Sequence, residues 1–361
     1  MNLIIIVFIS IFILLLFVSS LLVTVKRGMN ISVNTSANVN ISVIISVKNE
    51  QGKIKKLVDT LNNLIYPKNN FEIIIIDDNS TDSTLEELIK NTEGFQNFSI
   101  KELNPEGLSG KRNALTFGIQ NSQYPYLLIT DADCHPQKYW LQAYSEKFKA
   151  GYDVLFGIAP FYKEKHLVNR ISCFENLRNS LLSFSMALFG FPYTAAARNF
   201  GFTKKAFEAI GGYLNTKDTL SGDDDLLLRE AVKSKLKIGV VSATDSFVYS
   251  ETKKTFKEYF QQRARHTQTS FHYLRRHQVI LGFWHLTSLL FLFSPILMFV
   301  NVWFGILLAA KLLIDFIVVK STQNKFGYKF LFMEIFYLQI IYEIFLIVHF
   351  FNAQFSEIKW K

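Results

Sequence analysis

The sequence predicts an α/β protein in which a parallel sheet carries helices on both faces, with membrane-spanning helices near either end. Strand-like runs alternate with helical patterns between residues 41 and 130, which is typical of a parallel sheet. Hydrophobic residues make up 49% of the 361 residues and charged residues only 19%. Long uncharged runs lie near both ends, so a purely soluble protein is not expected.

The first apolar run, residues 3–25, contains no charged residue. A bilayer core is crossed by roughly 20 helical residues, so the run is long enough to span it. A cleaved signal peptide is the alternative, but no basic residue precedes the run and no small-x-small cleavage site follows it. Lys26 and Arg27 come directly after it, which places the following residues in the cytosol. We therefore expect residues 1–27 to form an N-terminal transmembrane anchor.

The middle of the chain, residues 38–275, is expected to form one cytosolic domain that begins with four strands separated by helices. The expected strands cover residues 41–47, 71–76, 98–103 and 126–130, and the expected helices cover residues 53–64, 83–90 and 114–120. Polar residues follow three of these strands, at Asn49–Glu50, Asp77–Asp78 and Asp131–Asp133. Ligands bind outside the carboxyl ends of parallel strands, so we expect these side chains to converge on one functional edge.

Asp131 and Asp133 form a D-x-D pair at the end of an apolar strand. Because side chains alternate along an extended segment, both carboxylates face the same side and suit a hard divalent cation such as Mg²⁺ or Mn²⁺. Cys134 and His135 adjoin the pair, and packing roles are favoured over a zinc site because no further Cys or His lies nearby. The two cysteines, Cys134 and Cys173, are too few for a disulfide framework.

Asp77 and Asp78 end the second expected strand. Capping of the next helix requires one residue such as Ser80 or Asp82, so an extra acid could accept a hydrogen bond from a base or a ribose. Lys111 comes after a glycine-containing segment at the start of the third helix and could meet phosphate charge, although the spacing is not that of a P-loop.

Three consecutive acids, Asp223 to Asp225, stand before an apolar helical stretch. At most one of them is needed as a cap, and a carboxylate held against an acceptor hydroxyl would be a general base. Farther along the chain, Gln262, Arg265 and His266 share one face of a predicted helix. The alternative for this helix is a basic interfacial helix that lies against lipid head groups.

The C-terminal apolar block, residues 280–352, is expected to contain about three transmembrane helices. Residues 284–319 are long enough for two spans with a break near Pro295 and Asn301, and residues 330–351 form another. Four charged residues fall within or near these spans: Lys311, Asp315, Glu334 and Glu343. We expect these charges to face neighbouring helices, with a lipid-binding cleft as the alternative.

The net charge of +9 indicates which classes of partner the chain favours. A basic cytosolic domain beside a membrane favours anionic lipid and a polyanionic substrate such as a nucleotide diphosphate. Nucleic-acid binding is not expected, because the chain has only one short basic run, at residues 53–56, and a DNA-reading domain has little use for membrane spans. Residues 167–192 are amphipathic and fit a membrane-surface helix and a core helix equally well.

Seven segments occur in a specific order and spacing, and together they resemble the membrane-bound glycosyltransferases of family 2. They are SVIISVKNE (Ser42–Glu50), IIIIDDNSTD (Ile73–Asp82), GKRNALTFGI (Gly110–Ile119), TDADC (Thr130–Cys134), ARNFGFTKKAFEAIGGY (Ala197–Tyr213), GDDDL (Gly222–Leu226) and QRARH (Gln262–His266). The resemblance runs from about Ile41 to His266. It implies a GT-A domain, whose mixed, mostly parallel sheet is flanked by helices and binds a nucleotide sugar.

The resemblance also implies roles for the acids near the strand ends. Asp78 would contact the nucleoside, with Asp77 as the alternative. Lys111 would neutralise the diphosphate. Asp131 and Asp133 would hold the donor phosphates through Mg²⁺ or Mn²⁺.

The family's E-D-x-D-L element maps onto residues 222–226, so Asp223 takes the position of the catalytic base. Gly222 stands where an acid is usual, which leaves Asp224 as a rival base. The segment Ala197–Phe207 resembles the floor of the acceptor site.

The family's Q-x-x-R-W element maps onto Gln262, Arg265 and His266, where Arg265 would stabilise the departing diphosphate. The implied function is inverting transfer of a sugar from a nucleotide-diphosphate sugar, with UDP-sugars favoured, to a lipid or polyprenyl-linked acceptor. The protein would be a multi-pass cell-membrane protein whose catalytic domain faces the cytosol. A Mg²⁺-dependent nucleotidyl- or phosphotransferase and a non-catalytic scaffold are the alternatives. A processive polysaccharide synthase is less favoured because His266 replaces a Trp that could stack on a sugar.

Overall fold

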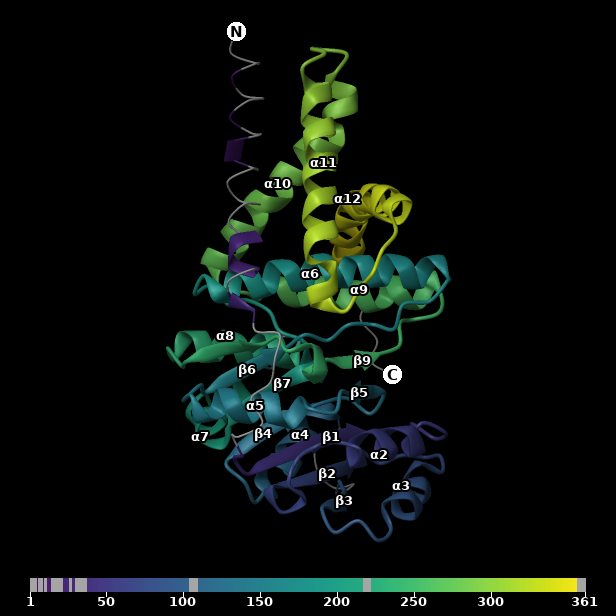
Figure 1. Cartoon of the computed structure of the whole chain (residues 1–361), viewed down its shortest axis with the longest axis vertical. Coiled ribbons are helices and arrows are strands. Elements are labelled where there is room, and N and C mark those ends of the chain that lie inside the picture. Colours follow the sequence, from purple (N-terminus) through teal and green to yellow (C-terminus); the bar gives the residue numbers. More distant parts are fainter. Residues whose placement is uncertain are drawn as a thin grey trace. The chain divides into compact units, whose positions relative to one another are not determined.

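The computed structural model describes residues 38–103, 110–216 and 222–355, together with residues 5, 9, 12, 13, 22–25, 28 and 29. The chain divides into two compact units (Figure 1). One, the sheet unit, comprises Asn30–Pro160 and Pro192–Glu251, and the other, the helical unit, comprises Met1–Met29, Phe161–Phe191 and Thr252–Lys361. The expected N-terminal span over residues 3–25 lies largely outside the described residues, and it stays a prediction together with the expected domain limits.

The sheet unit is built on a seven-stranded sheet with the order β3-β2-β1-β4-β7-β6-β8. These strands are β1 (Ile41–Val47), β2 (Phe71–Asp77), β3 (Phe98–Glu102), β4 (Tyr126–Ile129), β6 (Val154–Gly157), β7 (Phe200–Thr203) and β8 (Ile238–Val241). Neighbours from β3 to β4 run parallel, β7 runs antiparallel to both β4 and β6, and β6 runs parallel to β8. The expected mixed, mostly parallel sheet is therefore confirmed. A small second sheet pairs β5 (Cys134–Pro136) with β9 (Val248–Ser250).

The central strands form where the β-branched runs predicted them, because both faces of the sheet are buried. Ile73 to Ile76 in β2 are at most 1% exposed. The two faces are covered by helices that include α2 (Ile54–Asn62), α3 (Thr84–Thr92), α4 (Lys111–Gln120) and α5 (Trp140–Lys149). Residues of α2, α3 and α5 share one core with the side chains of Val43 and Ile45.

The opposite face of the sheet is covered by α4, which lies very close to it. A Cβ atom at Gly118 of α4 would lie 2.5 Å from side-chain carbons of Ile44 and Ile76. This close approach brings the first turn of α4, with Lys111, to the carboxyl ends of β1 and β2. The sheet unit also contains the short helix α7 (Lys204–Ala209) and the helix α8 (Asp223–Lys233).

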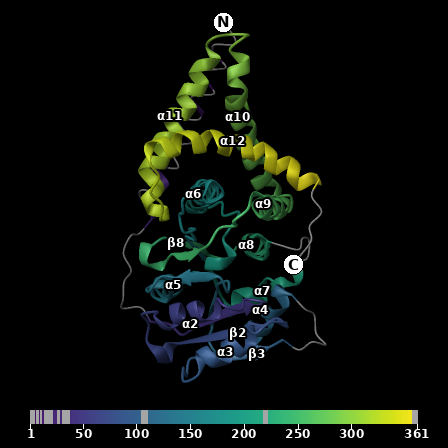
Figure 2. The ribbon, with the colours of Figure 1, turned by 90° about the vertical axis from the view of Figure 1, so that its right-hand side faces the viewer.

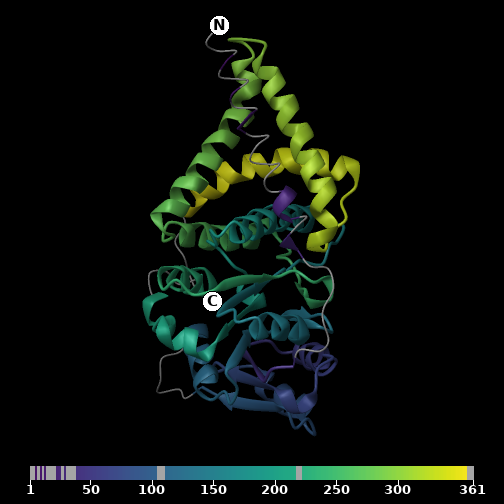
Figure 3. The same cartoon turned by 60° about the vertical axis from the view of Figure 1, so that its left-hand side comes forward.

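The helical unit contains α6 (Leu167–Leu188), α9 (Phe256–Ser270), α10 (Arg275–Leu297), α11 (Phe304–Thr322) and α12 (Phe332–Phe355). Figures 2 and 3 show α10 and α11 as a hairpin, with α12 running across its open end. Among the described residues, α10 and α12 are the two helices long and apolar enough to cross a membrane. The break between α10 and α11 falls at residues 298–303, so it includes Asn301, whereas Pro295 lies inside α10.

Within its own unit, α6 behaves as a core helix, one of the two alternatives left open by its amphipathic pattern. The ring of Phe174 packs edge-on against Phe330 and Tyr342, and the ring of Phe184 packs against Phe326. Phe174 and Phe184 are at most 2% exposed.

Candidate functional site

The first turn of α4 brings together three acidic segments that are far apart in the sequence. The backbone N–H of Gly110 donates a hydrogen bond to Asp78 Oδ1, at 3.0 Å. The ammonium of Lys111 lies 2.6 Å from Asp131 Oδ1. The guanidinium of Arg112 pairs with Asp223 through its Nε atom. Three successive residues therefore contact the three acidic groups that the sequence singled out.

The pair Asp131 and Asp133 offers oxygen ligands at the end of β4. One ligand atom from each of Asp131, Asp133 and Cys134 lies within 4.8 Å of the others. Burial raises the pKa of the Cys134 thiol well above its usual value, so this residue stays protonated and is a poor metal ligand. The two carboxylates suit a hard cation such as Mg²⁺ or Mn²⁺. His135 is outside this group of ligand atoms, which agrees with a packing role.

Lys111 links the D-x-D pair to the acids that begin α8. Burial alone would lower the pKa of the Lys111 ammonium, but the charges of Asp131 and Asp223 raise it above its usual value. For Asp131, burial alone would raise the pKa, and the charge of Lys111 lowers it below its usual value. Both groups are therefore charged at neutral pH, and Lys111 places one cation between two acidic segments.

Asp77 and Asp78 differ in what their oxygens contact. Asp78 accepts the hydrogen bond from Gly110, and its other oxygen lies 3.6 Å from the ammonium of Lys48. Asp77 Oδ2 accepts a hydrogen bond from the backbone N–H of Ser80, at 3.0 Å. Asp77 Oδ1 is buried and has no hydrogen-bond partner among the described residues. Asp77 therefore keeps a buried acceptor for a further donor.

The N-cap position of α3 is Ser83, whose side chain makes no capping hydrogen bond, so the expectation that Ser80 or Asp82 caps this helix is wrong. Asp82 Oδ1 accepts hydrogen bonds from the backbone N–H and from the hydroxyl of Thr84, at 3.1 and 2.5 Å. Ser80 instead accepts a hydrogen bond from the backbone N–H of Asn49. Asp77 and Asp78 do not cap this helix either.

The three acids at the start of α8 have three different partners. Asp223 pairs with Arg112, whereas Asp224 Oδ2 accepts a hydrogen bond from the backbone N–H of Ala197. Asp225 Oδ1 accepts hydrogen bonds from the hydroxyl of Thr194 and a neighbouring backbone N–H, at 2.6 and 3.0 Å. Burial, together with the charges of Asp225 and Asp223, raises the pKa of Asp224 well above its usual value. Asp225 thus orders the segment before β7, whereas Asp223 contacts a cation and Asp224 contacts a backbone N–H.

The segment Ala197–Phe207, expected as the floor of the acceptor site, contains a fully buried polar residue, Asn199. Asn199 Oδ1 accepts hydrogen bonds from the indole N–H of Trp140 and the hydroxyl of Tyr144, each at 2.8 Å. Its Nδ2 atom donates to the carbonyl of Ile158, at 2.8 Å. Asn199 therefore holds α5 against β7 beneath the site.

Sequence reasoning missed two residues of this region. It assigned no role to Arg112, although Arg112 adjoins Lys111 in the same segment. It also assigned none to Arg198, whose charge acts on Asp131 and whose Nη2 atom donates to the carbonyl of Ala159. A cation next to a predicted site residue was the available signal for Arg112.

Gln262, Arg265 and His266 lie on α9 in the helical unit, so their predicted role at the donor remains a prediction. Arg263, the other arginine of this segment, is an internal ion-pair partner, because its Nε atom lies 2.8 Å from Glu175 of α6. The assignment of Arg265 rests on the spacing of the predicted element and stays a prediction.

Residues 42–211 match the family model described as glycosyl transferase family 2. Residues 42–211, just under half of the chain, are therefore a glycosyl transferase family 2 region. The resemblance read from the sequence is therefore confirmed.

Named proteins with similar sequences include a synthase and a probable glycosyltransferase. The chain is 33% identical over 93 residues to the beta-monoglucosyldiacylglycerol synthase of Nostoc. The matched segment makes up 26% of this chain and 20% of that protein. It is 25% identical over 275 residues to the probable glycosyltransferase YdaM of Bacillus subtilis. That matched segment makes up 71% of this chain and 64% of that protein. The matches thus span less than two thirds of either relative.

A solved structure shares the fold over nearly the whole chain. The mannosyltransferase PcManGT from Pyrobaculum calidifontis, in complex with GDP-Man and Mn²⁺, aligns with a TM-score of 0.64 and 16% identity, over 97% of this chain and 96% of that one. This likeness supports the GT-A fold expected for the chain.

Proposed function

We propose that the chain transfers a sugar from a nucleotide-diphosphate sugar to a lipid or lipid-linked acceptor at the membrane, with inversion at the anomeric carbon. The observation that carries the proposal is the set of contacts made by Gly110, Lys111 and Arg112. These residues hold the side chains of Asp78, Asp131 and Asp223 around one helix N-terminus. Such a terminus favours an anionic group, and a diphosphate is the anion that the donor carries.

On the donor side, Asp77 is our choice for the nucleoside contact, because its buried Oδ1 atom is an acceptor without a partner among the described residues. Lys111 would contact the diphosphate. Asp131 and Asp133 would hold Mg²⁺ or Mn²⁺, which when bound neutralises phosphate oxygens of the donor. The complex of PcManGT with GDP-Man and Mn²⁺ supports this donor and metal class, and a UDP-sugar remains the expected donor.

On the acceptor side, Asp223 would take the proton from the attacking hydroxyl as that oxygen bonds to the anomeric carbon and the diphosphate departs. Arg112 contacts Oδ1 of Asp223, so it would orient the carboxylate and leave Oδ2 to face the acceptor. The raised pKa of Asp224 favours a protonated carboxyl at this position, which disfavours it as the base. Arg265, with Gln262 and His266, would contact the departing diphosphate.

The membrane part of the proposal rests on two observations. The helices α10 and α12 are long and apolar enough to cross a bilayer. The Nostoc relative is named for a diacylglycerol lipid, which supports an acceptor that resides in a membrane. We accordingly propose a multi-pass cell-membrane protein whose sheet unit faces the cytosol.

The proposal is tested by product analysis with the full-length protein in membranes and a panel of sugar donors. Wild type should release free nucleoside diphosphate, whereas release of pyrophosphate or transfer of a phosphoryl group would contradict sugar transfer. Asp223→Asn should lower the rate by roughly 10²- to 10⁴-fold, the usual contribution of a general base. Asp224→Asn is the matched control and should stay within about tenfold of wild type. Both variants should still bind nucleotide; a larger loss in Asp224→Asn than in Asp223→Asn would reverse the base assignment.

A further inference from the structure

A cluster of four charged side chains lies inside the helical unit, and none of the four belongs to the site described above. Arg178 of α6 pairs with Asp315 of α11, with Nη1 3.1 Å from Oδ1. Lys311 of α11 contacts Asp315 and also lies 2.9 Å from Oε1 of Glu343 on α12. These four side chains are between 3% and 10% exposed. The charges face neighbouring helices, as the sequence led us to expect for Lys311, Asp315 and Glu343.

The cluster is electrically balanced, with two cations and two anions. Each anion has a cation within 3.1 Å. A further charge placed here would have no counter-ion left over, and a buried charge without one is strongly unfavourable. The cluster can therefore accept an uncharged polar group more readily than a phosphate.

Next to the cluster, α12 carries polar atoms that the described part of the chain leaves without hydrogen-bond partners. Gln339 is 2% exposed, and both its Oε1 and its Nε2 atom lack a partner among the described residues. Oε2 of Glu343 is also without one. Residues four apart in a helix share a face, so these atoms are neighbours on α12. Buried polar groups are nearly always hydrogen-bonded, which calls for a partner here.

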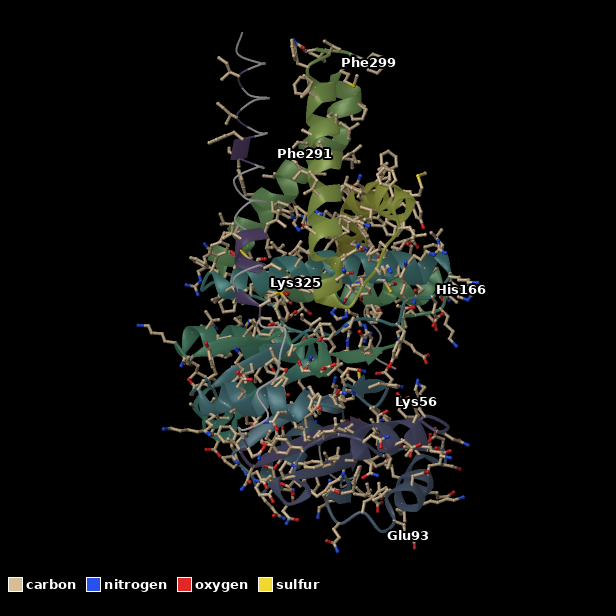
Figure 4. The ribbon with its side chains drawn as sticks, viewed as in Figure 1. Lys56, Glu93, His166, Phe291, Phe299 and Lys325 are labelled. Carbon is tan, nitrogen blue, oxygen red and sulfur yellow. The ribbon has the colours of Figure 1, made fainter. Side chains whose placement is uncertain are left out.

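The cation that pairs with Glu343, Lys311, lies beside aromatic rings. The ammonium of Lys311 lies 5.8 Å from the ring centre of Trp284 and 5.9 Å from that of Phe291, both on α10 (Phe291 is labelled in Figure 4). On the same helix, Phe283 and Leu286 are more than half exposed. A partner for Gln339 and Glu343 must therefore combine a small polar head with an apolar body.

We propose that Gln339 and Glu343 bind the hydroxyl-bearing head of an uncharged membrane lipid. One hydroxyl would donate to Oε2 of Glu343 and accept from Nε2 of Gln339, and a second hydroxyl would donate to Oε1 of Gln339. The lipid chains would lie along the apolar surface of α10. The binding itself stands without the sugar transfer proposed above, and only the use of this lipid as the acceptor rests on that function.

The test uses the full-length protein purified in detergent and titrated with monooleoylglycerol, whose two hydroxyls can serve both acceptors. Bound lipid is counted by native mass spectrometry, and affinity is measured in mixed micelles. Gln339→Leu should weaken binding about tenfold, because it removes the amide contacts. It should stay folded, since leucine removes the two buried amide atoms that lack partners, and Gln339→Met is a second variant of similar length. Gln278→Leu, the same change at the start of α10, is the matched control and should bind like wild type.

Two results would overturn the proposal: equal affinity of wild type and both Gln339 variants, or tighter binding of undecaprenyl phosphate than of monooleoylglycerol by wild type. Nucleoside diphosphate release is measured on the same preparations. Lipid binding that depends on Gln339 without such release would leave this site standing and would contradict the proposed sugar transfer. Release without Gln339-dependent binding would contradict the lipid site alone.

Discussion

The ion pair between Glu175 and Arg263 fixes α9 in the helical unit, and its removal is expected to show a distinctive dependence on pH. Glu175 lies on α6 and its side chain is 8% exposed. It accepts a hydrogen bond from the hydroxyl of Tyr259 on α9 and lies 3.4 Å from His349 on α12. The variant Glu175→Gln keeps the shape of the side chain and removes the charge that these groups share.

The size of the effect follows from the pKa of Glu175. Burial alone would raise this pKa, but the charge of Arg263 and the contact with His349 lower it from 4.5 to about 2. Because the folded pKa is below the unfolded one, the stabilisation is fully present well above pH 4.5 and is lost as pH falls through about 2. At 1.36 kcal/mol per unit, the pair contributes about 3 kcal/mol at pH 7 and about 1.4 kcal/mol at pH 3.

The assay is thermal unfolding of the detergent-purified protein between pH 3 and pH 7. At pH 7, Glu175→Gln should lower Tm by roughly 4 °C if the whole chain unfolds together, or by roughly 9 °C if the helical unit unfolds alone. At pH 3 the difference should shrink to less than half. Glu251→Gln removes an exposed pair with Lys56 at 3.9 Å and should change Tm by roughly 1 °C or less. A difference of equal size at both pH values would refute the reasoning.

Two further predictions concern the sheet unit. Asp77→Asn replaces a buried acceptor oxygen with a donor, so the affinity for nucleoside diphosphate, measured by calorimetry, should fall about tenfold. Asp78→Asn should lose less affinity. An equal loss in both variants would contradict the choice of Asp77. Asn199→Ala removes the acceptor of the Trp140 indole N–H and the donor to the carbonyl of Ile158, whereas the Tyr144 hydroxyl keeps the backbone carbonyl of residue 199. The variant should destabilise the fold by about 3 kcal/mol and lower the denaturation midpoint. An unchanged midpoint would contradict this buried role.

The strands and the acids that follow them were predictable because their signals are local. An apolar β-branched run such as Ile73 to Ile76 needs burial on both faces, and the turn after it must be polar. The positions of Asp77 and Asp131 at the same edge then follow from the parallel arrangement of the strands. The ends of α2 and α3 were predicted to within two residues, whereas α4 begins three residues before its expected start, at Lys111.

The distinctions between neighbouring residues were not predictable in this way. Nothing in the sequence separates Asp77 from Asp78, and their difference arises from the backbone N–H groups of Ser80 and Gly110. The sequence places Asn199 in a segment expected to form the floor of the acceptor site. In the structure its buried side chain accepts a hydrogen bond from Trp140 and donates one to the carbonyl of Ile158. Such roles depend on which groups the folded chain places within hydrogen-bond distance.

The sequence by itself determined the parallel strands, the acidic strand ends and the apolar C-terminal helices, because hydrophobic periodicity and chain length act over a few residues. Only the tertiary structure decided which acid meets which cation. The contact between Gly110 and Asp78 joins residues 32 apart, and the one between Arg112 and Asp223 joins residues 111 apart. Contacts over such separations depend on how the sheet and α4 pack, and no local pattern encodes that packing.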